Sequence, residues 1–304
     1  MQTIEIRHLW REYDDLVAIE DLSLTIEKGN VFALIGPNGA GKTTLLKILS
    51  SVLEPTYGEC FINGEKVHPT NNKLLSIIGF LPDFYGLYDD LKVYEYLEFF
   101  GRSYNIKQPA NRVKDVLEIV NLTYKKDELI CTLSRGMKQR LGIAKTILHD
   151  PEVLFLDEPA SGLDPKARIE LRHTIKNLRD LGKTMIISSH VLTELSDFCN
   201  SFGIMEKGKI IKTEIIRKEE KIHHIIINVL VGLDILQNIL TKHAKIENLH
   251  IKGNQINFDF KGTLDELSKF HKDLTESAAQ IIEFFIKKQD IEDLFLQYTS
   301  GQEE

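Results

Sequence analysis

At residues 36–43 the chain carries the stretch Gly36-Pro37-Asn38-Gly39-Ala40-Gly41-Lys42-Thr43, which matches the phosphate-binding pattern G-x-x-x-x-G-K-[ST]. Glycines let the backbone close around an anion, so that successive N–H groups point at the phosphates of a nucleotide. Lys42 supplies a mobile positive charge for the β- and γ-phosphates, and the Thr43 hydroxyl is a ligand for Mg²⁺. The apolar run Val31–Ile35 precedes this loop and a helical pattern follows it. This strand–loop–helix context predicts a nucleotide-binding α/β domain.

Two carboxylates follow a second apolar run. Val153–Leu156 leads directly into Asp157 and Glu158. A carboxylate at the end of a buried strand is costly without a cation or hydrogen bonds, so Mg²⁺ beside the nucleotide is the expected partner of Asp157. Glu158, one residue further on, is placed to polarise a water molecule aimed at the γ-phosphate.

The spacing of apolar residues predicts the architecture around these motifs. Short apolar runs without polar alternation, such as Val153–Leu156 and Met185–Ile187, indicate strands buried on both faces of a mostly parallel sheet. Residues from about 84 to 150 have apolar residues at helical spacing instead. We therefore expect a helical subdomain at about 84–150, inserted into the α/β domain.

Two further segments carry polar residues where a phosphate can be bound. Ser134, Arg135 and Gly136 open a predicted helix, and a small polar N-cap followed by glycine leaves the helix N-terminus accessible to an anion. If the site of Lys42 is already filled, the nucleotide of a second molecule is the expected target. His190 ends the strand that contains Met185–Ile187 and is a candidate phosphate sensor.

Taken together, these segments resemble the ATP-binding subunits of ABC transporters, a family of P-loop NTPases. The resemblance covers about residues 2–213, and the motifs occur in the family's order. GPNGAGKTT (36–44) resembles the Walker A loop, LSRGM (133–137) the signature and VLFLDEP (153–159) the Walker B strand. Ser161-Gly162-Leu163-Asp164 resembles the loop that touches the partner subunit, and His190 the switch histidine.

The resemblance implies an ATPase with ATP and Mg²⁺ as cofactors. Two chains, most simply a homodimer, would close head to tail on two Mg-ATP molecules and drive a separate membrane permease. The chain would then be cytoplasmic and peripheral on the inner face of the cell membrane. The residues implied are Glu158 and His190 for catalysis; Tyr13, Gly36, Pro37, Asn38, Gly39, Ala40, Gly41, Lys42, Thr43, Thr44, Ser134 and Gly136 for the nucleotide; and Thr43, Asp83 and Asp157 for the metal.

The sequence departs from the family's pattern at two places. The family usually has a glutamine where this chain has Asp83, and an ionised carboxylate cannot donate a hydrogen bond, although it can approach Mg²⁺. The signature has Arg135-Gly136-Met137 where Gly-Gly-Gln is commoner. This form of the signature, together with the extra C-terminal region, resembles single-subunit ATPases of bacterial exporters for drugs, antibiotics or lipid-linked polymers.

Composition excludes several other classes of protein. The 304 residues carry 38 basic and 45 acidic side chains, a net charge of −7, which argues against a general nucleic-acid binder. Three cysteines without a CxxC pair do not favour a disulfide framework or a structural zinc. We expect neither a secretory signal nor a membrane span, because the longest apolar stretch, Ile225–Leu233, is about half the length that a bilayer requires.

Residues 214–304 are predicted to form a separate accessory domain after the ATPase domain, 1–213. An apolar run at 225–231, a helical pattern at 234–243, alternating segments at 246–251 and 255–260, a second helix and a run at 281–286 give the order βαββαβ of a ferredoxin-like α+β domain. A last helix is expected around residues 291–298.

The loop after Asp83 is the expected contact with the permease, because it contains Phe84, Tyr85 and Tyr88, and exposed aromatic rings favour interaction sites. The alternative function is a soluble ABC-type ATPase acting on ribosomes or nucleic acid without a permease. Ribosome-acting members usually carry two cassettes and DNA-repair members long coiled coils, and this chain shows neither. A GTPase is disfavoured by the lack of an N-K-x-D motif, and a non-hydrolysing binder by Glu158 and His190.

Overall fold

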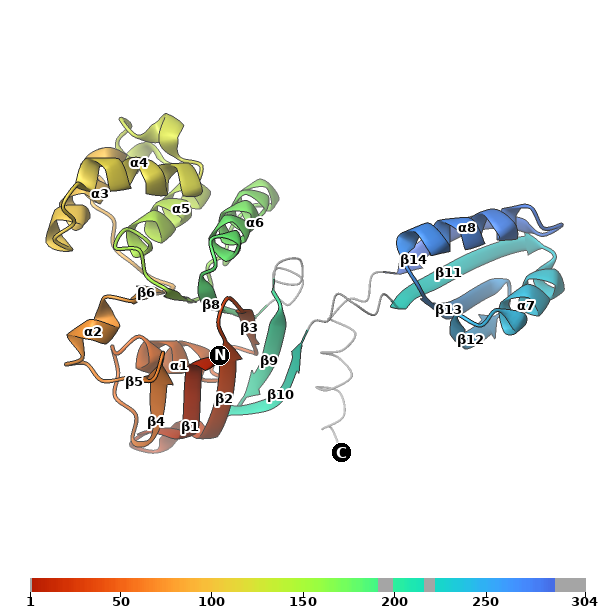
Figure 1. The fold of residues 1–304 in the computed structure, drawn as a ribbon, viewed down its shortest axis with the longest axis horizontal. Coiled ribbons are helices and arrows are strands. Elements are labelled where there is room, and N and C mark those ends of the chain that lie inside the picture. The colour runs from red at the N-terminus through yellow and green to blue at the C-terminus, as the bar shows by residue number, and fades with distance from the viewer. Residues whose placement is uncertain (1, 191–198, 216–221, 288–304) are drawn as a thin grey trace. The chain divides into compact units, whose positions relative to one another are not determined.

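The computed structural model describes residues 2–190, 199–215 and 222–287 (Figure 1). The chain divides into two compact units, Met1–Ile216 and Arg217–Glu304. Strand β10 (Lys209–Ile215) runs to the end of the first unit. The assignment of separate roles to residues 1–213 and 214–304 stays a prediction.

A six-stranded sheet forms the centre of the first unit, in the order β10-β9-β3-β8-β7-β6. All neighbours are parallel except β10, which pairs antiparallel with β9. The predicted strands at 31–35 and 153–156 are confirmed, and the run at 185–187 lies within β8. The members are β3 (Val31–Ile35), β6 (Ile78–Leu81), β7 (Val153–Leu156), β8 (Thr184–Ser189), β9 (Ser201–Glu206) and β10.

The order of these strands positions the site. β3, β8 and β7 are parallel neighbours, so their carboxyl ends meet at one edge of the sheet. The residues that follow each strand are therefore brought together although they are far apart in sequence. They are the phosphate-binding loop after β3, Asp157 and Glu158 after β7, and His190 after β8.

A second, antiparallel sheet packs on the first unit's core and was not part of the sequence-based expectation. Its order is β2-β1-β4-β5, and its apolar side chains share one buried cluster with helix α1 (Lys42–Leu49) and with Phe155 and Ile186 of the central sheet. The strands are β1 (Gln2–Tyr13), β2 (Leu16–Glu27), β4 (Tyr57–Ile62) and β5 (Glu65–Lys66), and the short helix α2 (Asn72–Leu75) follows them.

Helices occupy most of the region that was predicted to be helical, and Figure 1 shows α3, α4 and α5 gathered beyond the ends of β6 and β8. They are α3 (Val93–Ser103), α4 (Pro109–Ile119), α5 (Arg135–Thr146) and two 3₁₀ turns, Thr123–Lys125 and Ile130–Thr132. Helix α6 (Pro165–Asp180) follows β7.

Arg140 joins three of these helices. Its side chain on α5 is only 1% exposed. One guanidinium nitrogen donates to the carbonyl oxygens of Val120 and Asn121, at 3.0 and 2.8 Å, just after the end of α4. The second terminal nitrogen donates to the Glu170 carboxylate on α6 at 2.7 Å, while Nε is buried without a hydrogen-bond partner among the described residues. These contacts of the two terminal nitrogens offset much of the cost of burying the guanidinium.

The second unit has the predicted order βαββαβ, and its sheet order β12-β13-β11-β14, antiparallel throughout, confirms a ferredoxin-like arrangement. The apolar residues that alternate along β11 and β13 pack against both helices in one core. The expected helix at 291–298 lies outside the described residues. The elements are β11 (Ile222–Val231), α7 (Leu233–Lys242), β12 (Ile246–Lys252), β13 (Gln255–Lys261), α8 (Leu264–Thr275) and β14 (Gln280–Lys287).

Among the helices in residues 2–190, 199–215 and 222–287, none is both long enough and apolar enough to span a bilayer.

We expect Arg140→Ala to lower the free energy of unfolding by about 3 kcal/mol, because it leaves buried carbonyl groups and the Glu170 carboxylate without their donor. Urea unfolding of the full chain measures the loss. The control is Arg102→Ala, which removes an exposed ion pair with Glu98 and should cost no more than about 0.5 kcal/mol. Equal effects of the two substitutions would contradict the role of Arg140.

Candidate active site

The phosphate-binding loop turns tightly between β3 and α1, and its glycines are required for two different reasons. Gly39 and Gly41 have φ angles of 82° and 104°, a left-handed conformation that side-chain-bearing residues rarely adopt. At Gly36 an added Cβ would lie 2.1 Å from the Met205 carbonyl oxygen, and at Gly41 one would lie 2.4 Å from that of Ala18. The backbone N–H groups of this loop can thus approach an anion closely.

Gly41 is also the N-cap of α1, so no side chain caps the first N–H groups of this helix. The positive end of the helix is therefore available to a phosphate. Lys42, the first residue of α1, is 5% exposed. Its Nζ donates to the carbonyl oxygens of Gly36 at 2.7 Å and Pro37 at 3.1 Å, so the ammonium group curls back over the loop.

Asp157 is a fully buried carboxylate at the end of β7. Ser188 Oγ donates to its Oδ1 at 2.7 Å, and the Glu158 N–H in turn donates to Ser188 Oγ at 2.8 Å. The second oxygen, Oδ2, is buried and has no hydrogen-bond partner among the described residues. A buried carboxylate oxygen without a donor fits a cation ligand, so the donor set suits Mg²⁺ at the position that the sequence predicted for Asp157.

Glu158 lies between a histidine and a lysine. One carboxylate oxygen is 2.7 Å from His190 Nδ1, and the other is 3.3 Å from Lys42 Nζ. Its backbone has a φ angle of 46°, unusual for a residue with a side chain. Such strain is concentrated at functional sites, where surrounding contacts hold it in place. The structure therefore brings together Lys42, Glu158 and His190, three residues separated by more than 30 positions in sequence.

Asp83 lies near the same edge, two residues after β6. The Asp157 N–H donates to the Leu81 carbonyl oxygen at 2.9 Å, which fastens the end of β6 beside the end of β7. Partial burial, followed by the negative charges of Asp157 and Glu158, raises the pKa of Asp83, while Arg135 and His190 lower it. Asp83 is thus part of the electrostatic surroundings of Asp157 and Glu158.

Tyr13 lies at the end of β1, where it pairs with Leu16 of β2. Its side chain is 39% exposed, and the Arg11 guanidinium lies over its ring at 4.3 Å from the centroid. The neighbouring strand β2 reaches the phosphate-binding loop, since Ala18 lies against Gly41. The prediction that Tyr13 contacts the nucleotide stays a prediction.

The signature residues stand at the start of α5. Ser134 is the exposed N-cap, and its Oγ accepts from the Met137 N–H at 3.3 Å. Gly136 is buried, and an added Cβ would lie 2.4 Å from that of Ala167 on α6. Gly136 thus allows α5 and α6 to approach closely, whereas Ser134 faces solvent.

The prediction that Phe84, Tyr85 and Tyr88 are all exposed is wrong for Tyr85. Phe84 is 90% and Tyr88 54% exposed. The Tyr85 hydroxyl instead donates to the Lys138 carbonyl oxygen, and its ring lies where Gly142 has no side chain. A glycine on a neighbouring helix provided the space, and the local sequence gives no signal of that contact.

Ser188 is a functional residue that the sequence analysis missed. It is fully buried and links Asp157 to the backbone of Glu158. The one available signal is its polarity, because a hydroxyl near the end of a buried apolar strand needs a hydrogen-bond partner.

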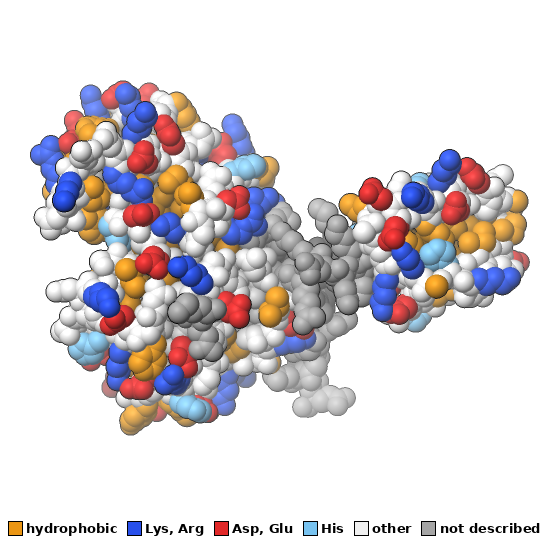
Figure 2. Space-filling view, in the orientation of Figure 1, with side chains coloured by type: hydrophobic (Ala, Val, Ile, Leu, Met, Phe, Trp, Pro, Cys, Tyr) orange, Lys and Arg blue, Asp and Glu red, His pale blue; other side chains and the backbone are white. Residues whose placement is uncertain are grey.

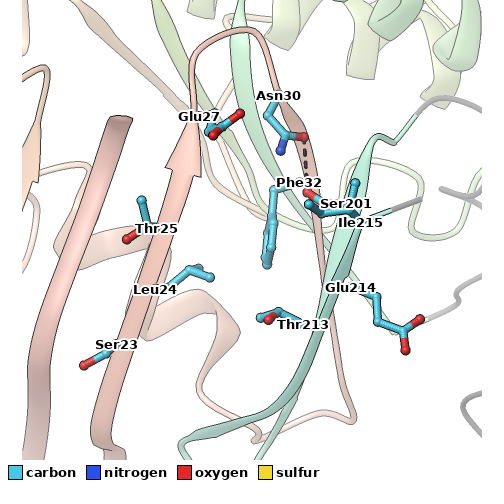
Figure 3. A pocket seen from close by; sticks show the side chains of 10 residues that line it. All are labelled: Ser23, Leu24, Thr25, Glu27, Asn30, Phe32, Ser201, Thr213, Glu214 and Ile215. Atoms are coloured by element: carbon cyan, nitrogen blue, oxygen red, sulfur yellow. Dashed lines mark hydrogen bonds between the residues drawn. The ribbon is translucent and has the colours of Figure 1, made fainter. Parts of the chain in front are cut away.

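Away from this edge, the surface carries mixed charge and the first unit has a cavity. Figure 2 shows Lys and Arg side chains interspersed with Asp and Glu on the visible face of each unit. A cavity of about 510 Å³ in the first unit lies apart from the predicted site residues. Figure 3 shows Phe32 near its centre and the hydrogen bond that Ser201 Oγ donates to Asn30 Oδ1. Its lining also includes Ser23, Leu24, Thr25, Glu27, Thr213, Glu214 and Ile215.

The chain is similar to known proteins in sequence and in fold. The family model described as ABC transporter matches residues 19–161. The Nod factor export ATP-binding protein I of Cupriavidus metallidurans is 30% identical in an alignment of 311 positions, which covers 98% of each chain. The linearmycin resistance ATP-binding protein LnrL of Bacillus subtilis is 33% identical over 210 residues, 68% of each chain.

Among solved structures, cbiO1 from Clostridium perfringens, described as part of the ABC transporter complex cbiONQ, superposes with a TM-score of 0.63 at 27% identity. The superposition covers 70% of this chain and 88% of that one. One of these relatives is similar to this chain over nearly the whole length of both. The chain belongs to the ABC transporter family, as an ATP-binding and ATP-hydrolysing subunit.

Proposed function

We propose that this chain is the cytoplasmic ATPase subunit of an exporter, and that two copies close head to tail on two Mg-ATP molecules to drive a separate membrane permease. The observation that carries the proposal is the cluster at the edge of the central sheet, in which Glu158 contacts both Lys42 and His190. Export is supported by the names of two relatives, one for Nod factor export and one for linearmycin resistance.

Nucleotide binding would depend on the loop after β3 and on Lys42. The Lys42 ammonium group now contacts Gly36 O, Pro37 O and Glu158 Oε1. The β- and γ-phosphates of ATP carry more negative charge than these acceptors, so they would compete for the same N–H donors. Mg²⁺, when bound, would neutralise negative charge on these phosphates, held by Asp157 and Thr43 and faced by Asp83.

Hydrolysis would use Glu158 as the base. The oxygen of a water molecule forms a bond to the γ-phosphorus, the bond from that phosphorus to the bridging oxygen of ADP breaks, and the proton of the water passes to the Glu158 carboxylate. His190, at 2.7 Å, would hold this carboxylate in place. A phosphate that attracts Lys42 would also remove the competing ion pair with Glu158.

The second copy would complete each site through Ser134. This residue is exposed at the N-terminus of α5, where the helix dipole favours an anion. The permease would bind the surface formed by Phe84 and Tyr88. Tyr88 packs edge-on against Phe99 and is stacked on Phe100 of α3, so its partly exposed ring is held in a rigid aromatic cluster.

Lys42→Ala should weaken ATP binding at least tenfold, since a charge-assisted contact in a semi-enclosed site is worth on the order of 2–3 kcal/mol. Titration with ATP by calorimetry measures the change. Lys47→Ala, an exposed lysine in the last turn of the same helix, is the matched control and should bind as the wild type does. Wild-type affinity in Lys42→Ala would refute the assignment of the phosphate-binding loop.

Glu158→Gln should lower the rate of ATP hydrolysis by about 10²–10⁴, because the amide keeps the shape of the side chain but cannot accept the proton. Binding should survive, so the protein should accumulate as an ATP-bound dimer in size-exclusion chromatography. Adding Ser134→Arg should abolish that dimer, because the larger side chain would block the N-terminus of α5 that faces the nucleotide of the second copy. Hydrolysis at the wild-type rate would falsify the assignment of the base, and a variant that binds ATP as a monomer would remove the head-to-tail dimer.

Phe84→Ser with Tyr88→Ser should reduce co-sedimentation with permease-containing membranes several-fold, because both exposed rings are lost from the proposed contact. ATP hydrolysis by the free subunit should be retained. Tyr57→Ser, at a ring that is 62% exposed on the antiparallel sheet, is the control. Undiminished membrane association in the double variant would place the permease contact elsewhere.

A further inference from the structure

Arg135 makes a contact that the pattern of the signature does not suggest. It is the first residue of α5, yet its guanidinium turns toward the loop that follows Glu158. Nη2 donates to the Ser161 carbonyl oxygen at 3.0 Å. The guanidinium also lies directly over Gly162, since an added Cβ there would be 2.5 Å from its carbon and from both terminal nitrogens.

This contact reaches the backbone of Glu158 through a single residue, Ser161. The Ser161 N–H donates to the Glu158 carbonyl oxygen at 3.0 Å, while the Ser161 carbonyl oxygen accepts from Arg135. The Glu158 N–H is fixed on its other side by Ser188 Oγ. The backbone of Glu158 has a φ angle of 46°, and a residue in that conformation persists only where neighbouring contacts hold it.

We propose that Arg135 is a positioning residue for Glu158: it holds the Ser161–Gly162 loop against the N-terminus of α5, and through Ser161 it supports the backbone of Glu158. The proposal rests on the proposed function, in which Glu158 is the base. It gives a role to Arg135, one of the two departures from the family pattern. A purely structural role is disfavoured because Arg135 is exposed and its hydrogen bond within the described residues is to a loop.

The test compares Arg135→Gln and Arg135→Lys in the full-length chain. Arg135→Gln should lower kcat about tenfold, the loss that one charge-assisted hydrogen bond supports, and leave KM for ATP within about twofold. Arg135→Lys keeps the charge and a donor but loses the planar cover of Gly162, so it should regain most of kcat. The urea midpoint should not move. The control is Lys138→Gln, which removes an exposed ion pair with Asp89 three residues further along the same helix.

Wild-type kcat in Arg135→Gln, or a raised KM with kcat unchanged, would overturn the positioning role, the second result indicating a direct contact with nucleotide.

Glu158→Gln is assayed in parallel, so that the two proposals fail separately. If Glu158→Gln hydrolyses ATP normally, the proposed function fails whatever the Arg135 variants do. If Glu158→Gln is inactive while Arg135→Gln behaves as the wild type, the assignment of the base stands and the role of Arg135 falls.

Discussion

Burial of the Asp157 carboxylate at the end of β7 constrains everything around it. A buried charge is costly unless hydrogen bonds or a cation compensate it, and here Ser188 donates to one oxygen while the other has no hydrogen-bond partner among the described residues. The first of these contacts depends on the parallel pairing of β7 with β8, which places Ser188 beside Asp157. The same pairing brings His190 to Glu158. The central sheet therefore brings these four residues together.

The loops at this edge hold unusual backbone conformations, and each has a supporting contact. Gly39 and Gly41 adopt left-handed angles that glycine tolerates without strain. Glu158 adopts one although it bears a side chain; its N–H donates to Ser188 Oγ, and its carbonyl oxygen accepts from the Ser161 N–H. The backbone conformation of Glu158 thus depends on hydrogen bonds to these two serines.

Helix α5 ties the helical part of the first unit to the catalytic edge in two ways. Near its middle, Arg140 is buried and bonds to Glu170 on α6, which makes it a contribution to stability. At its start, Arg135 is exposed and donates a hydrogen bond to the Ser161 carbonyl oxygen, where it positions a loop rather than packing in the core. The two arginines are five residues apart, so one helix serves both purposes on different faces. Close approach of α5 to α6 is possible because Gly136 lies against Ala167.

The sequence by itself determined the features that are encoded locally. The phosphate-binding loop, the buried strands at 31–35 and 153–156 and the order βαββαβ of the second unit are read from contiguous residues, because periodicity and turn chemistry act over a few positions. Only the tertiary structure decided which distant residues meet. The pairing of β1 with β4, the partial burial of Tyr85 and the contact of Arg135 with Ser161 depend on packing between segments 26 or more residues apart. A side chain's direction there is set by the space its neighbours leave, such as the missing side chain of Gly142, and nothing in the local sequence records that space.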